Sequence, residues 1–106
     1  ARLKPGQLPT ALLVDTDARG AQTVAALHEA GLRVPDDISV ASIDNRPEAA
    51  SCQPPLTTVG PDWTKIAEVT LDVIDRGLHS RQSQRINQVV PFKMALREST
   101  APPAKR

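Results

Sequence analysis

Two short apolar runs with one helix-length segment between them constrain the fold of this chain more than any other feature. The first run, residues 11–14 (Ala-Leu-Leu-Val), predicts a strand buried on both faces, as in a parallel sheet. Residues 18–30 carry apolar side chains near the helical period, and Gly31 after them favours a helix stop. Residues 38–43 form the second apolar run. The order strand, helix, strand predicts two parallel strands joined by a right-handed crossover.

The second half of the chain predicts one more helix and two short strands. The helix is expected over residues 62–76, with Gly77 as its stop, because apolar residues again recur at helical spacing. Strands are expected over residues 86–90 and 92–96. Pro91 separates them, since proline has no N–H to donate to a β-ladder.

The remaining segments predict little regular structure. Residues 1–9 are expected to be a linker or tail, residues 46–58 an irregular connection, and residues 99–106 a disordered tail. The first helix is expected to face the sheet with four small or apolar residues. These are Ala21, Val24, Ala25 and Leu27.

Composition excludes several classes of function. The 13 basic and 12 acidic residues leave a net charge of +1, so this chain is not expected to bind DNA by itself. The single cysteine, Cys52, excludes an intramolecular disulfide and fits a reducing, cytoplasmic compartment. We find no signal peptide and no apolar run long enough for a membrane span. Because the chain starts at Ala1 rather than Met, we expect it to be a piece of a longer protein.

Polar side chains follow both strands of the predicted strand–helix–strand unit. Asp15 and Thr16 come after the first strand, and Asp44 and Asn45 come after the second. Ligands of open α/β sheets bind outside the carboxyl ends of the strands, so these groups are expected to line one crevice. Carboxylates there suit hydroxyl-rich or N–H-rich ligands such as sugars or nucleosides. Trp63, at the start of the later helix, could add a flat apolar wall with a free indole N–H.

Each of these residues also has a purely structural interpretation. Asp17 is expected to be a helix N-cap, and Asp15 could serve the same end. Asn45 could simply form the turn after its strand, and Trp63 could be a core residue.

No set of residues points to catalysis or to metal binding. The chain has no positioned nucleophile and no glycine-rich phosphate loop. The two histidines, His28 and His79, do not have the spacing of metal ligands. We therefore expect a binding protein without enzyme activity, catalytic residues, metal or cofactor.

Five short motifs, in chain order, resemble the signature of one protein family. They are PTALLVDTD at 9–17, AGLRVPDDISV at 30–40, IDN at 43–45, PPLTTV at 54–59 and LREST at 96–100. The chain thereby resembles the lac-repressor/galactose-repressor family of bacterial transcription regulators. The resemblance implies an α/β fold, a parallel-sheet fragment of the type I periplasmic-binding-protein-like fold, in which two lobes enclose an effector.

The same resemblance implies a domain layout. Residues 10–98 would form part of the effector-binding domain. Within it, residues 10–60 and 91–98 would belong to the C-terminal lobe, and residues 61–90 would cross to the N-terminal lobe. The DNA-reading headpiece would precede residue 1.

The resemblance also implies roles for individual residues. Asp44 matches the aspartate that holds the effector, and Trp63 matches a position where some members place an aromatic residue against a sugar. Thr16 stands where many members have an effector-binding asparagine, which is a departure from the pattern. Asp17 matches a neighbouring aspartate with a structural role.

We therefore expect the small-molecule-sensing part of a cytoplasmic transcription regulator. The effector would be a sugar or a nucleoside, and DNA would be bound only through the absent headpiece. Exposed strand edges predict a homodimer or a swapped oligomer. The alternative is a fragment of a periplasmic sugar-binding transport protein, which would share the fold.

Overall fold

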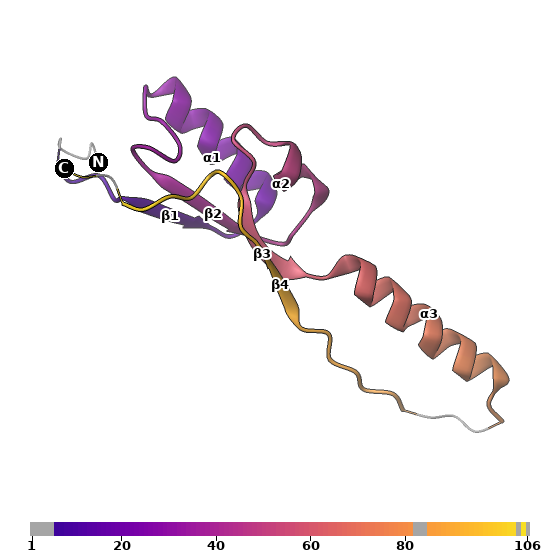
Figure 1. The fold of residues 1–106 in the computed structure, drawn as a ribbon. Helices are drawn as coiled ribbons and strands as arrows, with labels where there is room; N and C mark the ends of the chain where they lie inside the picture. Colours follow the sequence, from indigo (N-terminus) through magenta and orange to yellow (C-terminus); the bar gives the residue numbers. More distant parts are fainter. Residues whose placement is uncertain (1–5, 82–84, 104, 106) are drawn as a thin grey trace.

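The computed structural model describes residues 6–81, 85–103 and 105. A four-stranded sheet with the order β1-β2-β3-β4 organises the molecule (Figure 1). In chain order the elements are β1 (Ala11–Val14), α1 (Asp17–Glu29), β2 (Ser39–Ile43), α2 (Pro47–Ser51), β3 (Thr57–Pro61), α3 (Trp63–His79) and β4 (Phe92–Ala95). The first three strands are parallel neighbours, and β4 pairs with β3 in the antiparallel sense. The predicted α/β class and the strand–helix–strand order are confirmed.

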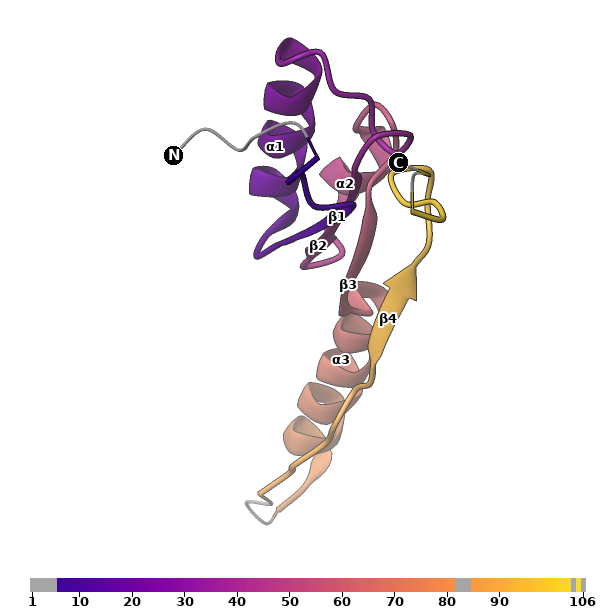
Figure 2. The same ribbon diagram turned by 90° about the vertical axis from the view of Figure 1, so that its left-hand side faces the viewer.

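The helices α1 and α2 lie on one face of the sheet and enclose the core there (Figures 1 and 2). Val24 of α1 and Val40 of β2 meet Leu56 in this layer, and all three are at most 2% exposed. Gly20 allows the close approach, since a Cβ there would lie 2.7 Å from Leu56 Cδ2. Ala25, expected to face the sheet, is instead exposed.

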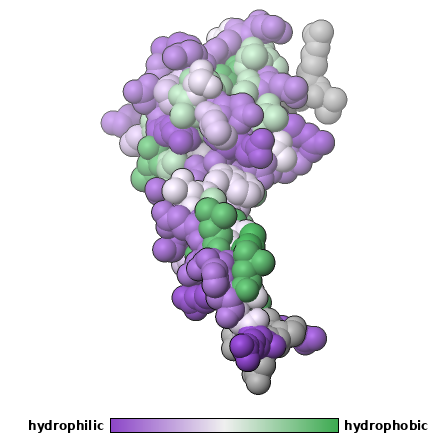
Figure 3. All heavy atoms as spheres, turned by 90° about the vertical axis from the view of Figure 1, so that its right-hand side faces the viewer, coloured by the Kyte–Doolittle hydropathy of each residue, from purple (hydrophilic) through white to green (hydrophobic). Residues whose placement is uncertain are grey.

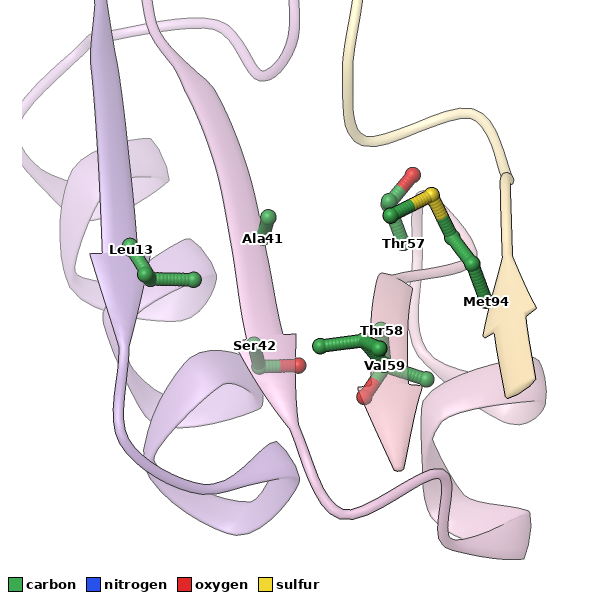
Figure 4. Close-up of a pocket in the computed structure, with 7 residues that line it drawn as sticks. All are labelled: Leu13, Ala41, Ser42, Thr57, Thr58, Val59 and Met94. Carbon is green, nitrogen blue, oxygen red and sulfur yellow. The ribbon is translucent and has the colours of Figure 1, made fainter. Parts of the chain in front are cut away.

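No described residue covers the opposite face of the sheet. Leu13 is 71% exposed, so the prediction that the first strand is buried on both faces is wrong. A shallow apolar hollow lies on the sheet, as Figure 4 shows. Its lining residues are Leu13, Ala41, Ser42, Thr57, Thr58, Val59 and Met94.

The helix α3 projects away from the sheet, and the chain then returns to enter β4 (Figure 1). The molecule is therefore elongated, with extents of 67 × 24 × 22 Å. None of the helix residues is buried, and Figure 3 shows apolar side chains gathered on this arm. The helix continues through Gly77, which has no positive φ, so the predicted stop at that glycine is wrong. Among the described residues, no helix combines the length and hydrophobicity that crossing a lipid bilayer requires.

Two predictions about the connecting segments are also wrong. Residues 46–58, expected to be irregular, contain α2 and the start of β3. Residues 86–90, expected to be a strand, form none, because no strand of the described part of the chain pairs with them. The strand that follows is shorter than predicted and ends at Ala95.

Residues 99–101, expected to begin a disordered tail, are instead held against the sheet. Ser99 is fully buried, and its Oγ donates to the Val40 carbonyl at 2.6 Å and accepts from the Thr57 amide at 2.8 Å. Its backbone accepts from the Val40 amide and donates to the Pro55 carbonyl. The Ala101 amide donates to Ser39 Oγ at 3.0 Å. The predictions for residues 1–5, 104 and 106 lie outside the described residues.

Candidate functional site

The loops after β1, β2 and β3 meet at one edge of the sheet, because these strands are parallel neighbours. Strand register places Val14 beside Ser42, and Ile43 beside Val59. The structure therefore brings all five predicted site residues to this edge. They are Asp15, Thr16, Asp44, Asn45 and Trp63. The loop after the middle strand, which carries Asp44, lies between the other two.

Asp15 and Thr16 are engaged with the first turn of α1. Thr16 is the N-cap, and its Oγ1 accepts from the Arg19 amide at 3.3 Å. Capping satisfies one of the amides that the first turn leaves without a partner. Asp15 forms an exposed ion pair with the Arg19 side chain. Both residues thus have structural partners at the rim of the candidate site.

Asp17 is the centre of a buried hydrogen-bond network, so the prediction that it is the N-cap is wrong. It is 1% exposed. Its Oδ1 accepts from Ser42 Oγ at 2.6 Å and from Thr58 Oγ1 at 2.5 Å, and its Oδ2 accepts from the Arg46 amide at 2.6 Å. One carboxylate therefore joins α1 to β2, to β3 and to the loop after β2. Its partners lie 25 to 41 positions away, so local sequence patterns give no signal for this role.

Asp44 and Asn45 form the turn after β2 in an unusual backbone conformation. Their φ angles are 126° and 55°, both in a region that residues other than glycine rarely adopt. The Asp44 amide donates to the Val59 carbonyl at 2.9 Å. The Asn45 amide donates to Thr58 Oγ1 at 3.2 Å, and its Nδ2 donates to the Pro61 carbonyl at 3.1 Å. Asn45 is therefore held by β3, which supports its structural interpretation as a turn residue.

The Asp44 carboxylate differs from the other acidic groups at this edge. Within the described residues, no hydrogen bond or ion pair engages it, although the residue is only partly exposed. Asp15 is paired with Arg19, and Asp17 is saturated by three donors. Asp44 thus offers two acceptor oxygens at the centre of the edge.

Trp63 stands beside this turn at the start of α3. Its indole Nε1 donates to the Asp44 carbonyl at 3.0 Å. The expectation that this N–H is free for a ligand is therefore wrong. The side chain is 46% exposed, which does not fit a core position. An exposed indole ring next to a carboxylate can stack against a ring-shaped ligand while the carboxylate accepts from its hydroxyl or N–H groups.

Sequence comparisons relate the chain to known regulators. Residues 1–100 match a periplasmic binding protein-like domain. The chain is 35% identical over 103 residues to the lactose operon repressor of Escherichia coli K12, covering 95% of this chain and 28% of that protein. It is 33% identical over 89 residues to the transcriptional repressor PurR of Glaesserella parasuis, covering 84% of this chain and 26% of the repressor.

Structural comparisons agree with the sequence relationships. A LacI family transcriptional regulator of Lactobacillus casei with bound sucrose superposes with a TM-score of 0.74 and 28% identity. The match covers 92% of this chain and 36% of the regulator. The lac repressor dimer bound to operator and an anti-inducer gives a TM-score of 0.73 with 33% identity, covering 92% of this chain and 34% of that one. This chain thus spans about a third of the length of these structures.

Proposed function

Because the chain belongs to the LacI family of transcription regulators, through its periplasmic binding protein-like domain, we propose that it forms the effector-sensing part of a DNA-binding repressor. The observation that carries the proposal is the Asp44 carboxylate. It has no partner among the described residues and lies where three parallel strands end, beside the half-exposed ring of Trp63. A buried or half-buried carboxylate without a donor is costly, and a ligand that supplies donors removes the cost.

The chemistry of the edge favours a sugar or a nucleoside as the effector. Two hydroxyls or N–H groups of the ligand can donate to Asp44, and a ring can stack on Trp63. Sucrose is bound to the related Lactobacillus casei regulator, which supports a sugar. Thr16 and Asn45 contribute to the shape of the site, because their polar groups already have protein partners.

The remaining parts of the proposal concern the whole protein. Residues 10–60 and 91–98 would form one lobe, and residues 61–90 would cross to a second lobe, which fits the absence of buried residues in α3. DNA binding would belong to a separate headpiece, since the chain carries a net charge of only +1. The protein would act in the cytoplasm as a homodimer and without enzyme activity, as its repressor relatives suggest.

The proposal is tested by calorimetry on the full-length protein with glucose, sucrose and adenosine as probes. Replacing Asp44 by Ala should weaken binding of the active probe by about 1–3 kcal/mol, the usual size of a lost charged hydrogen bond, or roughly 5- to 150-fold. The matched control is Asp36→Ala, which removes an exposed carboxylate whose ion pair with Arg33 lies on the α1–β2 connection. Equal affinities for the wild type and the Asp44 variant would contradict the proposed site.

A further inference from the structure

The turn that presents Asp44 is strained, and the strain needs a structural cause. Asp44 and Asn45 have consecutive positive φ angles of 126° and 55°. Asparagine tolerates the second value, but a φ of 126° is unfavourable for any residue with a side chain. Such conformations persist only where surrounding contacts determine them, and they cluster at functional sites. The contacts that hold this turn are therefore candidates for a role in function.

Gly60 of β3 provides the first contact. A Cβ at this position would lie 2.3 Å from the Asp44 carbonyl carbon, 2.5 Å from its oxygen and 2.7 Å from the Asn45 amide nitrogen. These atoms belong to the backbone, so they cannot rotate away as a flexible side chain would. Gly60 itself has no positive φ. A residue without a side chain is needed here for space, because the peptide group between Asp44 and Asn45 rests against β3.

Trp63 provides the second contact. Its indole N–H donates to the same Asp44 carbonyl oxygen that lies over Gly60. The Asp44 amide donates to the carbonyl of Val59, which is also in β3. Both hydrogen-bonding groups of the Asp44 backbone are therefore fixed by β3 and the start of α3, while its carboxylate is left without a partner in the described part of the chain.

We propose that Gly60 and Trp63 are positioning residues that hold Asp44 in its strained conformation and so fix the direction in which its carboxylate is offered to the effector. We call the contacts of Gly60 and Trp63 with the Asp44 backbone the clamp. The inference rests on the proposed function for its ligand, but the clamp is defined by the backbone geometry. It assigns two roles to Trp63: the indole N–H holds the backbone carbonyl of Asp44, and the exposed part of the side chain is left for the ligand.

Nuclear magnetic resonance tests the clamp without any ligand. Trp63 is the only tryptophan of the chain, so its indole N–H gives a single signal. We expect that signal to exchange with solvent at least about tenfold more slowly than the indole of free tryptophan, because it is hydrogen-bonded. Gly60→Ala should abolish the protection by displacing the Asp44 carbonyl. The control Gly77→Ala, where a Cβ meets nothing within 4 Å, should leave the signal unchanged. An unprotected indole in the wild-type chain would overturn the clamp.

Calorimetry on the full-length protein, with glucose, sucrose and adenosine, tests its consequence. Gly60→Ala should weaken binding of the active probe by about tenfold or more, the effect of misplacing a charged acceptor. Trp63→Phe keeps an aromatic ring but removes the N–H, and it should also weaken binding while its melting temperature stays close to that of the wild type. Unchanged affinity in both variants overturns the positioning role. If no probe binds the wild type, the proposed function fails, and the indole signal alone then decides whether the clamp exists.

Discussion

Replacing Asp17 by Ala should be among the most destabilising single changes in this domain. Its carboxylate accepts from Ser42 Oγ, Thr58 Oγ1 and the Arg46 amide, and both hydroxyl residues are 1% exposed. Hydrogen bonds to charged groups contribute about 1.5–3 kcal/mol each, and a buried donor left without an acceptor costs about 1–3 kcal/mol. The hydroxyls can rotate towards other acceptors, so the terms do not add in full, and we expect a loss of about 3–5 kcal/mol.

That loss is comparable with the whole stability of a small domain, about 5–15 kcal/mol. Urea unfolding followed by Trp63 fluorescence and by circular dichroism measures the free energy of unfolding directly. The stability of the Asp17→Asn variant should lie between those of the wild type and the Ala variant. The asparagine side chain keeps one acceptor oxygen, but its NH2 group replaces the other oxygen and faces groups that are themselves donors. Asp15→Ala is the matched control, and it should cost less than about 1 kcal/mol because its ion pair with Arg19 is exposed. A loss below about 1 kcal/mol for Asp17→Ala would refute the role of this network.

Two further predictions concern the C-terminal segment and the uncovered sheet face. Ser99→Ala should destabilise the domain by about 1–3 kcal/mol in urea unfolding, because the Thr57 amide would lose its buried acceptor; a cost near zero would contradict that contact. The 106-residue chain should also self-associate, since the sheet face around Leu13 is exposed and apolar. Light scattering should show an average mass that rises with concentration. Leu13→Lys should lower this mass, whereas the control Gln22→Lys, on the exposed side of the helix, should not. A compact monomer at high concentration would refute the predicted self-association.

The parts of the fold that the sequence predicts are those whose signals are local. Residues 11–43 contain an apolar run, a capped helix, a glycine stop and a second apolar run, and each of these acts over a few neighbouring positions. The wrong predictions depend on distant partners. The local sequence around Ser99 is typical of a polar tail. In the fold, its hydroxyl is buried because it donates to Val40 of β2 and accepts from Thr57 of β3. Residues 86–90 have the composition of a strand, but no strand within residues 6–81 or 85–103 pairs with them.

At the candidate site, the sequence likewise predicts where the residues lie but not which of their polar atoms are already hydrogen-bonded. The rule that ligands bind at the carboxyl ends of parallel strands correctly places the predicted residues at one edge, because it needs only strand order. It does not reveal which polar atoms the protein already uses. Thr16 is the helix N-cap, the side-chain amide of Asn45 donates to the Pro61 carbonyl, and the Trp63 indole N–H donates to the Asp44 carbonyl.

These contacts narrow the groups that a ligand can recognise. What remains at the centre of the edge is the Asp44 carboxylate and the exposed part of Trp63, and the backbone of Asp44 is held by contacts with β3 and α3. Under the proposed function, the effector donates to Asp44 and places a ring against Trp63, whereas the Asn45 backbone N–H and the Trp63 indole N–H are already engaged within the protein. Discrimination between sugars and nucleosides at this edge should therefore depend on the ring that stacks on Trp63 more than on the hydroxyls that any such ligand can offer to Asp44.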